Sequence, residues 1–196
     1  MTPLVKRSHF MKCRDDFTPV AVDPARRVVE IPATPSAILE RVARIPWGWV
    51  NKTMYDDDVL PQRIVDQKLR LFDLYDGDGD PIGYSIVNDP DQTVRSKFLS
   101  AVLHLNPIEM ENLAMFPGNE GRGRGKYFMY TIMKQLMDEG YNPVYFSTSH
   151  ANFPSLPAFY ERIGMRKIGE DQMLDSTQLP PRKTRAVNRF PILTAA

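Results

Sequence analysis

The chain carries a run of glycines and cations, EGRGRGK, at residues 120–126. Residues 108–116 before it are strand-like, and residues 126–139 after it repeat apolar side chains at the spacing of one helix face. Glycine lets main-chain N–H groups approach a ligand, and the start of a helix leaves its first N–H groups unpaired. The helix dipole and three cationic side chains add positive charge there. The run therefore predicts an anion-binding loop, with phosphate as its natural ligand.

Strand-like and helix-like stretches alternate on both sides of this loop. Strands are expected at residues 28–31, 69–75, 82–87, 108–116, 144–148 and 165–168, and helices at residues 35–45, 58–69, 126–139 and 155–163. A sheet covered by helices accommodates this order, so we predict an α/β arrangement with some antiparallel strand pairing.

Length and composition indicate one folded domain over residues 1–196, with a basic arm at residues 1–26 and a basic arm or edge strand at residues 171–196. Lysine plus arginine (25) almost cancels aspartate plus glutamate (24), which gives no electrostatic argument for a nucleic-acid or membrane binder. One cysteine and three histidines leave little for a structural zinc site. No stretch approaches the ~20 apolar residues of a membrane helix, so we expect a cytoplasmic protein.

The acidic turn DGDGDP at residues 76–81 invites comparison with a calcium-binding loop. Counted from Asp76, position six is Pro81, where such a loop needs glycine, and position twelve is Val87, where it needs glutamate. A hairpin turn between two strands is the better interpretation.

Three kinds of phosphate-binding segment do not fit residues 120–126. A Walker loop ending in Gly125-Lys126 would need glycine at Glu120 and a hydroxyl residue at Tyr127. A dinucleotide loop starting at Gly121 would need glycine or alanine at Lys126. An arginine–glycine RNA-binding segment would be longer and disordered, whereas regular stretches bracket this one. Coenzyme A (CoA), which carries a pyrophosphate, remains as the ligand.

Three features recur together around the loop. Residues 120–125 have glycines at the fourth and sixth positions, with Glu120 at the first. Residues 113–117 (LAMFP) are strand-like and end in proline, and residues 159–165 read FYERIGM. The combination resembles the GNAT superfamily of acyltransferases, whose loop pattern is Gln/Arg-x-x-Gly-x-Gly/Ala and whose late signature is Tyr-x-x-x-Gly-Phe. The resemblance covers residues 108–170 and, more loosely, residues 38–87. Within the superfamily, residues 47–49 (WGW) and 148–157 are similar to those of a group of small bacterial members.

The resemblance implies a fold and a co-substrate. The fold is α/β (α+β): a central mixed, mostly antiparallel twisted sheet of six to seven strands flanked by about four helices. The co-substrate is acetyl-CoA or another acyl-CoA, with no metal, and its thioester is attacked directly by a primary amine. The residues implied in CoA binding are Leu113, Ala114, Met115, Arg122, Gly123, Arg124, Gly125, Lys126 and Asn152.

The resemblance also suggests catalytic groups. Tyr160 matches the tyrosine that protonates the departing thiolate, although its spacing also fits a core aromatic residue. Glu109 falls where some family members carry a glutamate base, and Glu111 would share its face in a regular strand. Either acid would also suit a solvent-facing position. Three aromatic residues are candidates for the wall of the acceptor pocket or for the core: Trp47, Trp49 and Tyr55.

The leading interpretation is transfer of an acetyl group from acetyl-CoA to a primary amine of a small molecule, in a protein that binds neither nucleic acid nor membrane and is a possible homodimer. One alternative keeps the fold without catalysis, as a CoA-binding domain. Another is nucleic-acid interaction through Arg122, Arg124 and the basic ends, whose affinity would fall steeply with added salt.

Overall fold

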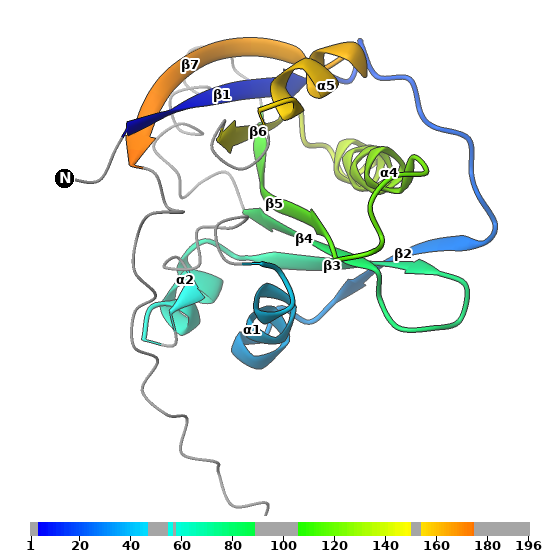
Figure 1. Cartoon of the computed structure of the whole chain (residues 1–196), viewed down its shortest axis with the longest axis vertical. Coiled ribbons are helices and arrows are strands. Elements are labelled where there is room, and N and C mark those ends of the chain that lie inside the picture. Colours follow the sequence, from blue (N-terminus) through cyan, green and yellow to red (C-terminus); the bar gives the residue numbers. More distant parts are fainter. Residues whose placement is uncertain (1–3, 47–54, 57, 89–105, 150–153, 175–196) are drawn as a thin grey trace, which may run out of the picture.

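The computed structural model describes residues 4–46, 55–56, 58–88, 106–149 and 154–174, which form one sheet with helices on both faces (Figure 1). The strands are β1 Leu4–Lys12, β2 Arg26–Ile31, β3 Arg70–Asp76, β4 Gly83–Asn88, β5 Ile108–Met115, β6 Val144–Ser149 and β7 Arg166–Leu174. The helices are α1 Pro35–Ala43, α2 Leu60–Asp66, α4 Arg124–Asp138 and α5 Leu156–Arg162. The seven strands lie in the order β2-β3-β4-β5-β6-β1-β7. All neighbours pair antiparallel except β5 and β6, so the expected mixed, mostly antiparallel sheet is confirmed.

Helix α4 covers one face of the sheet, with α5 beside it (Figure 1). Its predicted apolar stripe is buried: Phe128, Ile132 and Leu136 are each fully inaccessible and pack with strand residues such as Phe72 and Ile108. Burial of this stripe is what holds α4 on the sheet, since apolar area removed from water is the main stabilising contribution. The helix begins at Arg124, two residues earlier than expected, so the glycine loop leads directly into its first turn.

Helices α1 and α2 cover the opposite face. Thr34 caps α1 as the sequence suggests, because its hydroxyl accepts a hydrogen bond from Ala37 N at 3.2 Å. Ile38 of α1 and Leu60 of α2 are fully buried in a second cluster with Tyr84 of β4. Helix α2 is shorter than the residues 58–69 predicted for it.

Residues 4–12 do not form part of the N-terminal arm that the sequence indicates for residues 1–26. Instead, β1 lies inside the sheet between β6 and β7. Its cations have distant partners: Lys6 and Arg7 pair with Glu170 and Asp171 of β7, at 3.3 and 2.6 Å. Strand β7 is an edge strand, as proposed for the start of residues 171–196, and residues 175–196 lie outside the described part of the chain.

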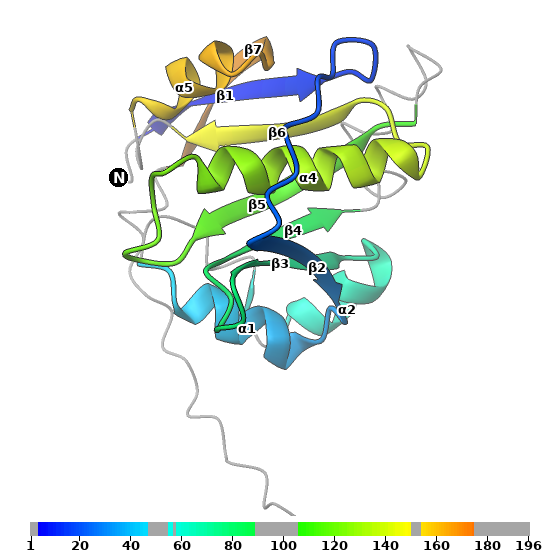
Figure 2. The ribbon, with the colours of Figure 1, turned by 90° about the vertical axis from the view of Figure 1, so that its right-hand side faces the viewer.

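The connection from β1 to β2 crosses the outer side of α4 (Figure 2). Phe17 of this connection stacks on Tyr130 of α4, with ring centroids 5.4 Å apart, and Val20 packs against the same cluster. The crossing therefore adds a layer over α4 close to the glycine loop.

Candidate functional site

Strands β5 and β6 pair only near their starts. Their parallel partners are Ile108 with Val144 and Glu109 with Tyr145, after which β5 continues along β4 and β6 along β1. From residue 110 onward, the edge of β5 that faces β6 has no strand partner in the described sheet. Main-chain groups along such an edge can pair with an extended ligand. Three predicted cofactor residues lie on this part of β5: Leu113, Ala114 and Met115.

The loop after β5 passes through left-handed backbone conformations. The φ angles of Gly121, Arg122 and Gly123 are 80°, 51° and 72°. Gly123 is the N-cap of α4, where glycine adopts a positive φ without the strain that a side chain would bring. It also has no side chain to accept the first-turn N–H groups, and the helix itself supplies none. The amides of Gly125 and Lys126 therefore remain donors for a ligand.

The three cations of the loop differ in what they contact. Arg124 donates from Nε and Nη2 to Asp76 Oδ2, at 2.8 and 2.5 Å, so the β3–β4 turn holds its guanidinium. Arg122 and Lys126 have exposed side chains. Positive charge for an anion therefore comes from Arg122, Lys126 and the helix start, whereas Arg124 fixes the loop.

Glu120 stands where the family pattern has glutamine or arginine. Its exposed side chain turns back on the loop, and its carboxylate accepts the main-chain N–H of Gly118 at 2.8 Å. This hydrogen bond stabilises the turn that precedes the left-handed residues. The carboxylate is thereby tied to the turn rather than extended toward the start of α4.

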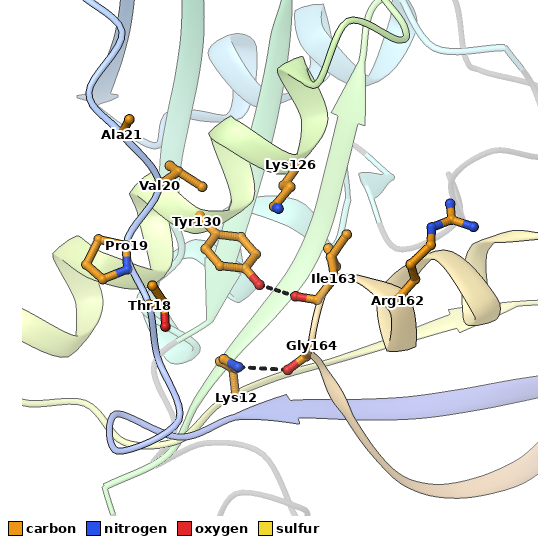
Figure 3. Close-up of a pocket in the computed structure, with 10 residues that line it drawn as sticks. All are labelled: Lys12, Thr18, Pro19, Val20, Ala21, Lys126, Tyr130, Arg162, Ile163 and Gly164. Carbon is orange, nitrogen blue, oxygen red and sulfur yellow. Dashed lines mark hydrogen bonds between the residues drawn. The ribbon is translucent and has the colours of Figure 1, made fainter.

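A cavity of about 500 Å³ lies beside the first turns of α4 (Figure 3). It is open to solvent and is lined by residues 18–21 of the β1–β2 connection, by Lys126 and Tyr130 of α4, and by the end of α5. Lys12 reaches it from β1 and donates to the carbonyl oxygen of Gly164 at 2.7 Å. Cationic side chains border the cavity, and none of the described residues that line it is acidic, so it favours an anionic ligand.

Glu111 is the extra residue of a β-bulge in β5, because Ile86 pairs with Asn112 while Val87 pairs with Met110. The bulge removes the regular alternation on which the prediction of a shared face for Glu109 and Glu111 depended, but the Glu111 side chain still contacts the face that carries α2.

The Glu111 carboxylate is engaged on both oxygens. Tyr55 Oη donates to Oε1 at 2.6 Å and Arg63 Nη2 donates to Oε2 at 2.7 Å. The Glu111 and Arg63 side chains are only 8% and 11% exposed. Burial, with the Glu111 charge as a second cause, raises the pKa of Tyr55 well above its ordinary value, so this phenol remains a donor. The structure thus brings two predicted site residues, Tyr55 and Glu111, together in a buried network.

Glu109 is the last residue of β5 that pairs with β6. It lies directly opposite Asn88 of β4 and Tyr145 of β6, on the face that carries α1 and α2. The pKa of Arg7 is raised, first by its hydrogen bond to Asp171 and also by the charge of Glu109. Glu109 therefore lies within electrostatic range of a guanidinium from β1.

Tyr160 of α5 packs between two strands. Its ring lies 5.4 Å from that of Phe10 and 4.6 Å from that of Phe146, measured between centroids. Burial raises the pKa of Tyr160 to about 12, so the phenol is protonated at neutral pH. Tyr160 thus packs as a core aromatic residue and also keeps the protonated hydroxyl that a general acid needs.

Three predicted site residues lie outside the described part of the chain: Trp47, Trp49 and Asn152. Sequence reasoning missed two residues that organise the site, Arg63 and Asp76. In the sequence, Asp76 belongs to a segment that was compared only with calcium-binding loops. Nothing local in the sequence indicates that its partner is Arg124.

Among the described residues, no three His, Cys, Asp or Glu side chains come close enough to bind a metal ion together. No helix in those same ranges combines the length and apolar character needed to cross a membrane.

Residues 38–165 match the model of the acetyltransferase (GNAT) family. The match includes most of α1, strands β5 and β6, the glycine loop and Tyr160. This chain belongs to the GNAT family of acetyltransferases. No curated protein matches the chain significantly in sequence.

Solved structures show the same fold at low sequence identity. A GCN5-related N-acetyltransferase from Sphaerobacter thermophilus is 14% identical, with a TM-score of 0.56 over 86% of this chain and 50% of its own. A tandem GNAT protein from the clavulanic acid biosynthesis pathway is 14% identical, with a TM-score of 0.54 over 86% and 52%. A conserved protein of unknown function from Staphylococcus epidermidis is 10% identical, with a TM-score of 0.59 over 87% and 60%. The chain thus spans between half and three fifths of the length of these proteins.

Proposed function

We propose that the protein transfers an acetyl group from acetyl-CoA to a primary amine of a small molecule. The observation that carries this proposal is a glycine-capped helix start with free amide donors, located where the edge of β5 loses its strand partner. An elongated ligand with a pyrophosphate next to an amide-bearing arm suits both features at once, and acetyl-CoA has this chemistry.

The loop would bind the pyrophosphate through the main-chain N–H groups of Gly125 and Lys126, helped by the Arg122 and Lys126 side chains. The Arg124 amide, expected from the sequence to be a further donor, already donates to the Gly121 carbonyl oxygen at 3.1 Å. The partnerless edge of β5 at Leu113, Ala114 and Met115 would pair with the amides of the pantetheine arm. The cationic cavity next to Lys126 would take the phosphorylated nucleotide end.

Glu109 is our candidate for the general base. An ammonium group has no lone pair, so it must lose a proton before its nitrogen attacks the thioester carbon. Glu109 lies where β5 and β6 begin to separate, and Glu111 is already committed to Arg63 and Tyr55. Because both carboxylate oxygens of Glu111 are already engaged, neither is available to an incoming amine, which favours Glu109 over Glu111.

Tyr160 is our candidate for the general acid. As the carbon–nitrogen bond forms and the carbon–sulfur bond breaks, the departing thiolate takes the phenolic proton. The proton that the nitrogen loses as the amide forms then restores Tyr160 through solvent. A phenol whose pKa is about 12 is fully protonated at neutral pH and ready to donate. Main-chain N–H groups near Met115 would stabilise the oxyanion of the intermediate.

The test is calorimetric titration with acetyl-CoA and desulfo-CoA, followed by a thiol-release assay with lysine, putrescine, tyramine, kanamycin and a short peptide. Cofactor binding with turnover of at least one small amine supports the proposal. Cofactor binding without turnover of any of these amines would favour a CoA-binding domain without catalysis. Salt-sensitive binding of nucleic acid together with no affinity for CoA would replace the proposal altogether.

A further inference from the structure

Asn88, the last residue of β4, has a polar atom without a partner. The residue is 4% exposed, and its side-chain oxygen Oδ1 has no hydrogen-bond partner in the described part of the chain. Buried polar side-chain atoms are nearly always hydrogen-bonded, so an unpaired one needs an explanation. An amide oxygen accepts hydrogen bonds, and the missing partner is therefore a donor.

The surroundings of Asn88 identify what kind of donor it would meet. Asn88 and Glu109 are direct partners across β4 and β5. Alternation along β4 places Asn88 on the same face as Tyr84 and Ile86, which contact the α1 and α2 cluster. Direct cross-strand partners have Cβ atoms about 5 Å apart, so the amide and the carboxylate are close neighbours. One acceptor oxygen and one anionic group thus lie side by side.

This pair lies at the point where a substrate would react. Glu109 is the last residue of β5 that pairs with β6, and the partnerless edge of β5 begins immediately after it. A cofactor lying along that edge would bring its thioester close to this point. Asn88 and Glu109 are therefore at the base of the separation between the two strands.

We infer that Asn88 Oδ1 and the Glu109 carboxylate together form the binding site for the primary ammonium group of the acceptor. The inference rests on the proposed function and specifies its substrate class: a cation with N–H donors. The site discriminates against anions, which Glu109 repels, and against quaternary ammonium ions, which leave Asn88 unpaired. Asn88 acts as a positioning residue that holds the nitrogen while Glu109 removes its proton.

The experiment uses methylammonium chloride as the probe and tetramethylammonium chloride as the control cation without N–H donors. Both are titrated into the native full-length chain while the side-chain amide signal of Asn88 is followed by NMR. We expect a saturable shift with methylammonium and none with tetramethylammonium. Equal responses to both salts, or none to either, would overturn the inference.

Two variants test Asn88 itself. Asn88→Ala should weaken methylammonium binding about tenfold or more, the usual effect of losing a hydrogen bond to a charged group. Asn88→Asp retains an oxygen at the same position and should retain binding. Loss of binding in Asn88→Asp, or normal binding in Asn88→Ala, contradicts the inference.

The melting temperature of the unliganded variants shows whether Asn88 serves a ligand or stabilises the fold. Because Asn88 Oδ1 makes no hydrogen bond within the described residues, Asn88→Ala should lower the melting temperature of the unliganded protein less than the loss of a hydrogen-bonded buried asparagine does. Asn112 is the matched control, since its Nδ2 donates to Tyr84 Oη at 3.2 Å, and Asn112→Ala should be destabilised. A large loss of stability in Asn88→Ala would instead indicate a structural contact. A crystal soaked in methylammonium that shows only an unchanged water at Oδ1 would also overturn the site.

Calorimetry with acetyl-CoA distinguishes a failure of the proposed function from a failure of the ammonium site alone. If the native protein does not bind acetyl-CoA, the proposed function fails. If acetyl-CoA binds normally to native and Asn88→Ala proteins but methylammonium does not respond as described, only the ammonium site fails.

Discussion

Arg124 Nε lies 2.8 Å from Asp76 Oδ2, which joins the first residue of α4 to the last residue of β3, where the turn to β4 begins. The two side chains are 15% and 24% exposed, so water screens the pair only partly. The arginine of the loop is thus used to fix where the helix begins. The loop's amides, rather than this guanidinium, are left to meet an anion.

Asp76→Asn should therefore weaken CoA binding, by about three- to tenfold, because a part-buried pair of this kind contributes ~1 kcal/mol to loop order. Calorimetric titration of CoA measures the effect. Asp78→Asn is the matched control, as Asp78 lies two residues later in the β3–β4 turn with an exposed side chain. Tighter binding by Asp76→Asn would mean that a released Arg124 contacts phosphate directly.

Two glycines of the loop should respond oppositely to alanine. Gly123 has φ of 72°, so Gly123→Ala should cost ~1 kcal/mol of stability and should misdirect the first amides of α4, lowering CoA affinity. Gly125 lies within α4, and an added Cβ would meet Met115 Cγ at an ordinary 3.9 Å. Gly125→Ala should therefore stabilise the helix by about 0.5–1 kcal/mol. Chemical denaturation and CoA titration of both variants check this, and unaltered CoA affinity in Gly123→Ala would contradict the proposed use of the loop.

Tyr160→Phe should lower kcat by about tenfold or more while leaving CoA affinity unchanged, because it removes the acid and keeps the ring. Since the pKa of Tyr160 is about 12, its titration should not limit native activity up to pH 9.5. The pH profile of kcat measures both points. An alkaline loss of activity below pH 9.5 that disappears in Tyr160→Phe would contradict the raised pKa.

Local patterns were sufficient for the central elements of the fold. The apolar face of α4, the Thr34 cap of α1 and the hairpin of β3 and β4 all depend on residues a few positions apart, and each is present. The sequence did not predict strand β1, because its cations without nearby acids are typical of a solvated arm. Lys6 and Arg7 pair with acids 164 positions away, a relationship that no local pattern contains.

The site was predictable to a similar degree. The glycine loop follows from the spacing of its own residues, and its position before α4 is confirmed. The bulge that makes Glu111 an extra residue of β5 was not predictable. A bulge depends on the register with β4, and period-two alternation cannot reveal it.

Glu111→Gln should mainly lower the stability of the protein, whereas Glu109→Gln should mainly lower its catalytic activity. Glu111 is 8% exposed and pairs with Arg63, so its loss leaves a buried guanidinium without a counter-charge and should cost about 3 kcal/mol or more. Glu109→Gln should fold with smaller loss and reduce kcat/KM for the amine about a hundredfold, within the range for removal of a general base. Denaturation curves and steady-state kinetics on the same samples decide between the roles. Full activity in Glu109→Gln would exclude it as the base.

Asp171 should contribute to stability in a pH-dependent way. The Arg7 guanidinium, and to a lesser extent His9, hold the pKa of this carboxyl well below its usual range. The folded chain therefore binds fewer protons than the unfolded chain, in which an aspartate titrates near ~3.9. The contribution of Asp171 is present above about pH 4 and is lost as the pH falls further.

The free energy of unfolding, measured between pH 2 and pH 7, should accordingly fall less steeply with acid in Asp171→Asn than in the native protein. In an Arg7→Gln background the Asp171→Asn change should alter that slope much less, because the main cause of the lowered pKa is already gone. If the slope changes equally in both backgrounds, Arg7 does not hold the Asp171 carboxylate.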